Sequence, residues 1–291
     1  MSRCRRSTLK SSSTSAAGFT ALELLMGVLL MGLAVAATSG MFLASEHQMQ
    51  MQQLQLETTQ AARSAADVIV RDLRLGGACL PVTGDFISLS GIDNGTSDTI
   101  ITRTGLTRPD LSCIRSVVPT GMTVTASGSA VPVQSSDGFS AGMRAYLRHP
   151  DGTGEYFDVS SVPSATQLNK TQSLSRDYPA TSGVYGIDER KYYLGTWTGP
   201  TTTQPDLLMQ IGDQAPQPFA LGIEKLDIQY QLQRNCPPCD VVSLPASNSE
   251  WSIVDVVLLS ITARSAQPDS QGNYYRRTVT VDVKPRNLLP Q

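Results

Sequence analysis

The residue whose chemistry is hardest to explain by folding alone is Glu23. It stands at the head of an apolar run, residues 24–44, which contains no other charged side chain. A carboxylate in a membrane-spanning segment costs about 2.5–3.5 kcal/mol on insertion scales, so it calls for a cationic partner. Cleavage of the chain after Gly18 would create one, because the new amine on Phe19 is a cation at neutral pH. The pattern therefore predicts a charge pair between Glu23 and an amine in the plane of the membrane.

The chain ahead of this junction is a short leader, residues 1–18, which is polar and carries four cations. Such a segment is expected to stay in the cytoplasm by the positive-inside rule. The apolar run behind it has about 20 residues, enough to cross a bilayer as a helix at about 1.5 Å per residue. An ordinary secretory signal cut after Ala36 and an uncleaved anchor both fit this length. Both leave Glu23 without a role, and the apolar run continues past residue 36.

The junction also resembles a known signal, and the residues that carry the resemblance are Gly18-Phe19-Thr20-Ala21-Leu22-Glu23-Leu24-Leu25. This segment is similar to the class III signal of type IV pilins and type II secretion pseudopilins. The resemblance implies that a prepilin peptidase cuts after Gly18 and methylates the amine of Phe19, and that Glu23 serves assembly. Ala21 departs from the pattern, which usually has a larger apolar residue there. The resemblance also implies a single-pass inner-membrane protein with a periplasmic domain, which enters a pilus on assembly.

Cysteine is the second residue type that could do chemistry. Cleavage of the leader removes Cys4 and leaves an even set of four, which predicts two disulfides in an oxidising compartment. Three connectivities are possible, and we favour Cys79–Cys113 with Cys236–Cys239. The first bond would fasten the end of a long helix to a loop rich in Gly, Ser and Thr.

The Cys236-Pro237-Pro238-Cys239 segment has the spacing of dithiol oxidoreductases and of half a zinc site. A redox motif activates its first thiol at a helix N-terminus, whereas this one follows a strand-like segment, residues 226–232. A zinc site would need two further ligands, and the chain has only two histidines, His47 and His149. We therefore predict a structural disulfide in a tight turn, with redox and metal chemistry as the alternatives.

Other chemistry finds little support, and we predict neither an enzyme nor a cofactor or metal site. The histidines lie far apart, and no nucleophile elbow or phosphate loop is present. Asp93, Asn94 and Asp98 lack the spacing of a calcium loop and are expected to be solvated. The net charge of −2 gives no reason to expect nucleic acid as a partner.

Several aromatic side chains could form a carbohydrate or partner surface. We instead favour cross-strand packing for them, since aromatic residues on strands commonly pair in that way. The residues concerned are Tyr192, Tyr193, Trp197, Tyr274 and Tyr275.

The elements that must position these residues divide the chain into four parts. We expect the leader 1–18, a membrane or filament-core helix 19–44, an amphipathic half of the same helix 45–77, and an exported β-rich domain 78–291. In the amphipathic half, the spacing of Ala61, Ala65, Val68, Ile69, Asp72 and Leu73 predicts a stripe that packs on a sheet. The pair Gly76-Gly77 is a good helix stop.

The β-rich part reads as an irregular segment, about 80–140, followed by more regular strands. Strands are predicted at 99–103, 122–126, 190–194, 207–211 and 223–232, with hairpins formed by 143–148 with 155–159 and by 253–264 with 274–283. Strands gathered after one long helix predict an α+β fold, with an antiparallel sheet against the helix, which is the pilin-like arrangement.

Blocks in the second half extend the resemblance to PilW-type minor pilins and, less closely, to the J-type minor pseudopilin of type II secretion. They are residues 189–194, 222–230, 256–265, 275–281 and 286–287. The resemblance implies a low-abundance subunit that initiates or caps a filament, with other minor pilins, the major pilin, the prepilin peptidase and the inner membrane as partners. A secretion pseudopilin is the alternative, and a membrane-anchored periplasmic thiol-disulfide protein is a distant one. The genes beside this one would separate pilus from secretion.

Overall fold

The computed structural model describes residues 20–196, 205–269 and 271–287. The chain divides into two compact units, Met1–Gln52 and Gln53–Gln291. The long helix α1 (Ala21–Leu75) contributes its first part to one unit and its second part to the other. A four-residue helix, α2 (Asn248–Trp251), and fourteen strands complete the described structure. The fold is therefore α+β, as the sequence predicts.

The larger sheet follows the strand order β1-β2-β8-β5-β6-β7-β4, with β3 and β9 also paired to β8 and β10 paired to β9. Its ladders are antiparallel. The bounds are β1 (Leu89–Ile92), β2 (Thr99–Gly105), β3 (Arg115–Val117), β4 (Ala130–Pro132), β5 (Arg144–Arg148), β6 (Gly154–Ser164), β7 (Gln167–Lys170), β8 (Gly183–Thr196), β9 (Pro205–Ile211) and β10 (Gln217–Ala220).

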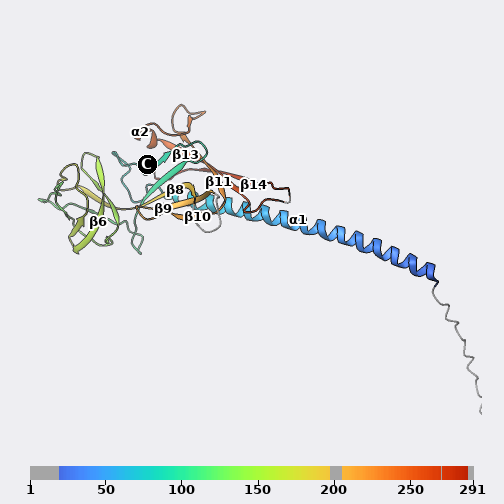
Figure 1. The fold of residues 1–291 in the computed structure, drawn as a ribbon. Coiled ribbons are helices and arrows are strands. Elements are labelled where there is room, and N and C mark those ends of the chain that lie inside the picture. Colours follow the sequence, from blue (N-terminus) through green and yellow to red (C-terminus); the bar gives the residue numbers. More distant parts are fainter. Residues whose placement is uncertain (1–19, 197–204, 270, 288–291) are drawn as a thin grey trace, which may run out of the picture. The chain divides into compact units, whose positions relative to one another are not determined.

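The smaller sheet has the order β12-β11-β13-β14 and is also antiparallel. It contains β11 (Ile223–Leu232), β12 (Val241–Val242), β13 (Val254–Arg264) and β14 (Arg276–Val283). Figure 1 shows β11, β13 and β14 beside the second part of α1, whereas β6 lies at the other end of the same compact unit.

The first hydrophobic core lies between α1 and these strands. Small side chains at Ala62, Ala65 and Ala66 let the helix approach closely, and Ile69 and Leu73 fill the space beyond them. Helical spacing alone aligns these residues on one face, so the predicted stripe is confirmed as a buried face. The stripe meets residues of β11 and β13, among them Ile228, Tyr230, Leu259 and Ile261, which are also buried.

The helix ends where the sequence predicts, at the two glycines after Leu75. Gly77 has φ +81°, a left-handed conformation that glycine adopts without strain. A Cβ atom there would lie 2.6 Å from the carbonyl oxygen of Asn287, which follows β14. Any other residue would therefore push the end of the last strand away from the end of the helix.

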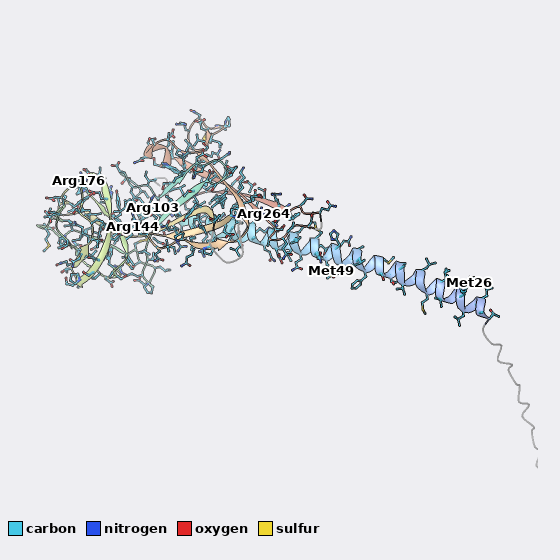
Figure 2. The ribbon with its side chains drawn as sticks, in the orientation of Figure 1. Met26, Met49, Arg103, Arg144, Arg176 and Arg264 are labelled. Atoms are coloured by element: carbon cyan, nitrogen blue, oxygen red, sulfur yellow. A yellow bond between two sulfur atoms is a disulfide. The ribbon has the colours of Figure 1, made fainter. Side chains whose placement is uncertain are left out.

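A second core fills the part of the compact unit built from β4 to β7 and the start of β8. Its centre holds Val131, Leu147, Phe157 and Leu168, all fully or almost fully buried. A third, small cluster of Leu80, Tyr146 and Ile187 has Phe86, Tyr156 and Tyr185 packed against it. In this region two arginines labelled in Figure 2, Arg103 and Arg144, lie over the ring of Tyr156 at 5.6 and 5.3 Å.

Most predicted strands are confirmed, with β8 and β6 much longer than expected. The strand predicted at 122–126 is wrong. Val124 makes an isolated bridge with Tyr178 through two hydrogen bonds of 2.8 and 2.9 Å, and no ladder extends from it. Gly121 and Gly128 flank this bridge, and glycine weakens a strand because it has no side chain to pack against neighbouring strands.

Candidate functional site

The first candidate site is the start of α1. Thr20 stands just before the helix, and its carbonyl and hydroxyl oxygens accept hydrogen bonds from the backbone N–H of Glu23 at 3.0 and 3.3 Å. Thr20-x-x-Glu23 has the spacing of a capping box, and a carboxylate in the first turn is favoured by the helix dipole. These bonds to Thr20 use the backbone N–H of Glu23 and not its carboxylate. Gly18 and Phe19 lie outside the described residues.

The helix that follows is exposed on every side within its own unit. All side chains from Thr20 to Gln50 are exposed, and α1 continues unbroken through its glycines at 27, 32 and 40. Met26, labelled in Figure 2, has 61% of its surface exposed. The helix is long and apolar enough to span a membrane. This stretch fits a single-pass membrane anchor.

Both favoured cysteine pairs are bonded in the structure, Cys79 to Cys113 and Cys236 to Cys239. The first bond links the turn after α1 to the segment before β3. Two such bonds are typical of a domain that folds in an oxidising compartment.

The Cys236–Cys239 turn follows β11 and precedes β12, and no helix begins at its first thiol. Arg234 pairs with Asp240 at 2.8 Å and with Glu250 at 2.7 Å, and Asn235 also donates to Asp240. These contacts hold the turn on both sides. The positive end of a helix dipole, which would activate a catalytic thiol, is not supplied here.

A buried polar contact joins α1 to the larger sheet. One carboxylate oxygen of Asp72 accepts a hydrogen bond from the Tyr192 hydroxyl at 2.5 Å and from an Arg190 guanidinium nitrogen at 2.9 Å. Arg190 also pairs with Asp188 on its own strand. Burial, followed by the hydrogen bond to Asp72, raises the pKa of Tyr192 well above its usual range. The phenol therefore stays a donor, and this cluster fixes the helix against β8.

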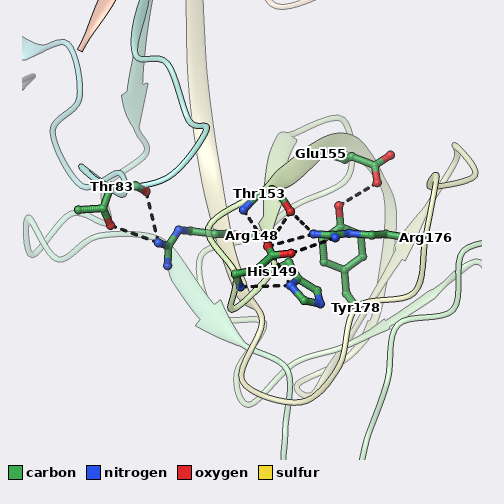
Figure 3. A network of polar contacts seen from close by, with 8 residues as sticks. Thr83, Arg148, His149, Thr153, Glu155, Arg176 and Tyr178 are labelled. Atoms are coloured by element: carbon green, nitrogen blue, oxygen red, sulfur yellow. Dashed lines mark hydrogen bonds and ion pairs between the residues drawn. The ribbon is translucent and has the colours of Figure 1, made fainter. Parts of the chain in front are cut away.

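A second polar network surrounds the turn between β5 and β6 (Figure 3). Asp151 accepts hydrogen bonds from Thr153 at 2.7 Å and from Arg176 at 3.1 Å, and His149 Nδ1 lies 2.9 Å from it. Arg176 and then Thr153 hold the pKa of Asp151 well below its usual range. This carboxylate therefore stays ionised and fully partnered, which suits a fixed turn better than acid–base catalysis.

Beside it, the Tyr178 hydroxyl donates to Glu155 at 2.8 Å, and Ser175 donates to the same carboxylate at 2.7 Å. Burial and then the bond to Glu155 raise the pKa of Tyr178 far above that of a free phenol. The network also reaches the loop after α1, because Arg148 donates to Thr83 at 3.2 Å. The hydrogen bonds of this network hold neighbouring loops together.

The expectation of a solvated loop is correct for Asp93 and Asn94, which are exposed, and wrong for Asp98. Asp98 is buried, and its carboxylate accepts the backbone N–H groups of Asn94 at 3.0 Å and Ile228 at 2.8 Å. A carboxylate can replace a missing strand partner in this way, so Asp98 ties the loop before β2 to β11. No group of three His, Cys, Asp or Glu side chains suited to a metal occurs among the residues placed in the structure.

The aromatic side chains do not form one surface. Tyr192 is fully buried and packs edge-on against Phe219, so it cannot face a ligand. Tyr274 lies under Arg264 at 4.3 Å, in the loop before β14. Tyr193 is half-buried beside Lys191. Trp197 lies outside the described residues.

Comparison with models of protein families finds no match to this chain, and comparison with curated proteins finds none either. The observations define an α+β protein with an apolar N-terminal helix that fits a membrane anchor, followed by a disulfide-bonded β-rich unit.

Proposed function

We propose that this chain is a minor subunit of the type IV pilin class, which helps to initiate or cap a filament. The observation that carries the proposal is the Gly18-Phe19 junction with Glu23 at the head of a helix that is apolar and exposed through its first half. The packing of the second half of α1 on an antiparallel sheet supports a pilin-like arrangement.

The role of Glu23 follows from its cost in the membrane. Thr20 bonds to the backbone of Glu23 and leaves its carboxylate free to accept another donor. Within one helix the chain's own amine is a poorer partner than that of a neighbouring subunit. Pairing between Glu23 of one subunit and the amine of Phe19 of the next would set the register of the two helices as they leave the bilayer.

A substitution series at the helix start separates this role from capping. Glutamine preserves a capping box and removes only the charge. We expect Glu23→Gln and Glu23→Ala to be cleaved normally, with Phe19 as the first residue by mass spectrometry, and to form both disulfides. Both variants should lose association with the nearest minor subunit by at least about tenfold, the equivalent of one 1.4 kcal/mol interaction. Thr20→Ala, which keeps the charge and loses the cap, is the matched control and should associate.

Two results would argue against the proposal. A mature chain that begins at Ala37 would indicate an ordinary secretory signal. Normal association of Glu23→Gln, measured both in the membrane and in surface filaments, would leave the charge without a function. Separately, loss of protein secretion with pili unchanged, on deletion of this chain, would favour the type II secretion alternative.

A further inference from the structure

The smaller sheet ends in a long strand whose outer edge pairs with no other strand among the residues that the structure describes. β14 is last in the order β12-β11-β13-β14, and its strand partner is β13. In an antiparallel ladder, alternate residues direct their N–H and C=O groups away from the neighbouring strand, so an edge strand presents a row of unpaired groups. Across the described segments, no hydrogen bond joins the backbone of residues 276–283 to anything beyond β13.

The other strands at sheet edges or ends are short, and β14 is the exception. β1 and β10 have 4 residues each, β4 has 3 and β12 has 2. β14 has 8, and every one of them pairs with β13 without a bulge. It contains neither proline nor glycine. Natural proteins usually shorten, bulge or cover such an edge, because it is otherwise a template for aggregation.

The side chains of β14 alternate in a way that suits a further strand. Val279 and Val281 pack against the first core, while Thr278, Thr280 and Asp282 are exposed. Thr and Val are the residues most favoured in strands. Arg277 is exposed and forms no ion pair within the part of the chain that the structure places. A strand that pairs here should therefore offer alternate apolar side chains and a carboxylate opposite Arg277.

We propose that β14 is a docking edge, to which an extended segment of another subunit adds as a fifth strand of the smaller sheet. The inference rests on the proposed function in one respect, that the partner is a neighbouring subunit. A second copy fits less well, because parallel pairing would place Arg277 against another arginine. Antiparallel pairing would place the second parts of the two α1 helices, each beside its own β14 (Figure 1), in opposite directions, whereas subunits of one filament share one direction.

Site-directed cross-linking tests the edge in the full chain, in membranes that contain its neighbouring subunits. Thr280→Cys places a photoactivatable label in the middle of β14. Ser160→Cys is the control for non-specific labelling, because it places the same label on an exposed residue of β6, in the larger sheet and not in the sheet that contains β14. We expect the label at position 280 to cross-link, at least about five times more than at position 160, to one extended, acid-containing segment of a neighbouring subunit. Mass spectrometry of the linked peptide identifies that segment.

Two further measurements complete the test. Amide hydrogen exchange of residues 276–283 should slow when the neighbouring subunits are present. Arg277→Glu should keep the melting temperature of the free chain and lower the cross-linking yield roughly tenfold, since an attractive pair becomes a repulsive one. A cross-link to β14 of a second copy, or equal yields at positions 280 and 160 with unchanged exchange, would overturn the inference. Glu23→Gln, analysed in the same membranes, shows separately whether the proposed function holds.

Discussion

At the scale of single residues, Asp72 is the side chain on which the joint between helix and sheet depends. It is buried, and its two donors come from β8, more than 110 residues later in the chain. Apolar contacts alone would tolerate small shifts of the helix along the sheet. The polar contact of Asp72 fixes the helix at one position. Loss of the Asp72 carboxylate would lower stability mainly because its buried donors on β8 would lose their acceptor.

We therefore predict that Asp72→Ala lowers the free energy of unfolding by about 2–4 kcal/mol, since it leaves the buried Tyr192 hydroxyl without its acceptor and removes one of the two carboxylates that pair with Arg190. Tyr192→Phe, which removes one bond to a charged acceptor, should cost about 1.5–3 kcal/mol. Urea denaturation gives both values. The control is Arg63→Ala, an exposed residue of the same helix, which should change stability by less than about 0.5 kcal/mol. Equal effects of Arg63→Ala and Asp72→Ala would refute the assignment.

Several carboxylates have lowered pKa values, and Glu224 and Glu155 are two of them. A hydrogen bond and an ion pair with Arg276 lower the pKa of Glu224. At Glu155, burial acts to raise the pKa, but hydrogen bonds from Ser175 and Tyr178 outweigh it and the net pKa is lowered. A lowered folded-state pKa means that the stabilisation is present above the unfolded pKa, about 4.3, and disappears as the pH falls through the folded value.

We predict that stability declines as the pH falls below about 5, and that Glu224→Gln flattens this decline. Thermal unfolding between pH 3 and 7 measures it. Glu46→Gln, on the exposed stem, should leave the slope as it is. The effect of Asp98 on stability runs the other way, because burial raises the pKa of its carboxyl group in the folded chain. Its contribution to the free energy of unfolding is therefore greatest in acid and disappears as the pH rises through the folded-state pKa. A decline that Glu224→Gln leaves untouched would show that other groups govern it.

At the scale of elements, the two disulfides close loops of very different length. Cys79–Cys113 spans 34 residues and Cys236–Cys239 spans 3. Loop-closure entropy predicts that replacing the first pair with serine costs about 4 kcal/mol and the second about 2 kcal/mol. Chemical denaturation of each double variant compares them, and non-reducing peptide mapping shows both bonds in the parent chain. Recovery of a reactive, low-pKa thiol at Cys236 would favour the thiol-disulfide alternative.

Local patterns explain which elements the sequence could predict. The stripe ending at Leu73 repeats with helical period, and the turn at Asp151-Gly152 lies between alternating strands, so both are readable from neighbours in the chain. β3 and β4 have three residues each and no such pattern. They exist because β8 and β7 supply their partners, and no local signal encodes a partner 35 to 70 residues away.

The sites divide in the same way. Counting predicts two disulfides and leaves three connectivities, of which the structure has the favoured one, and Glu23 stands out against its apolar surroundings. The capping role of Thr20 was readable from the same six residues but needs the helix to begin at Ala21. Asp98 looks like an ordinary surface carboxylate in sequence, and the helical stripe places Asp72 on the packed face without indicating its partners. Only the tertiary structure shows that backbone and side-chain donors from distant strands surround them.

At the scale of the whole molecule, the order of the elements along the chain has a consequence for biogenesis. The buried face of α1 ends at Leu73, whereas β11, β13 and β14, which cover it, come from the last 70 residues or so. The contact between Gly77 and Asn287 closes only when almost the entire chain is present. During export from the N-terminus, the apolar stripe would therefore wait uncovered until the end of translocation. Contacts between residues so far apart in the sequence form slowly, and the uncovered apolar face is meanwhile prone to aggregation. A chaperone that binds the unfolded chain would therefore act mainly on this helix.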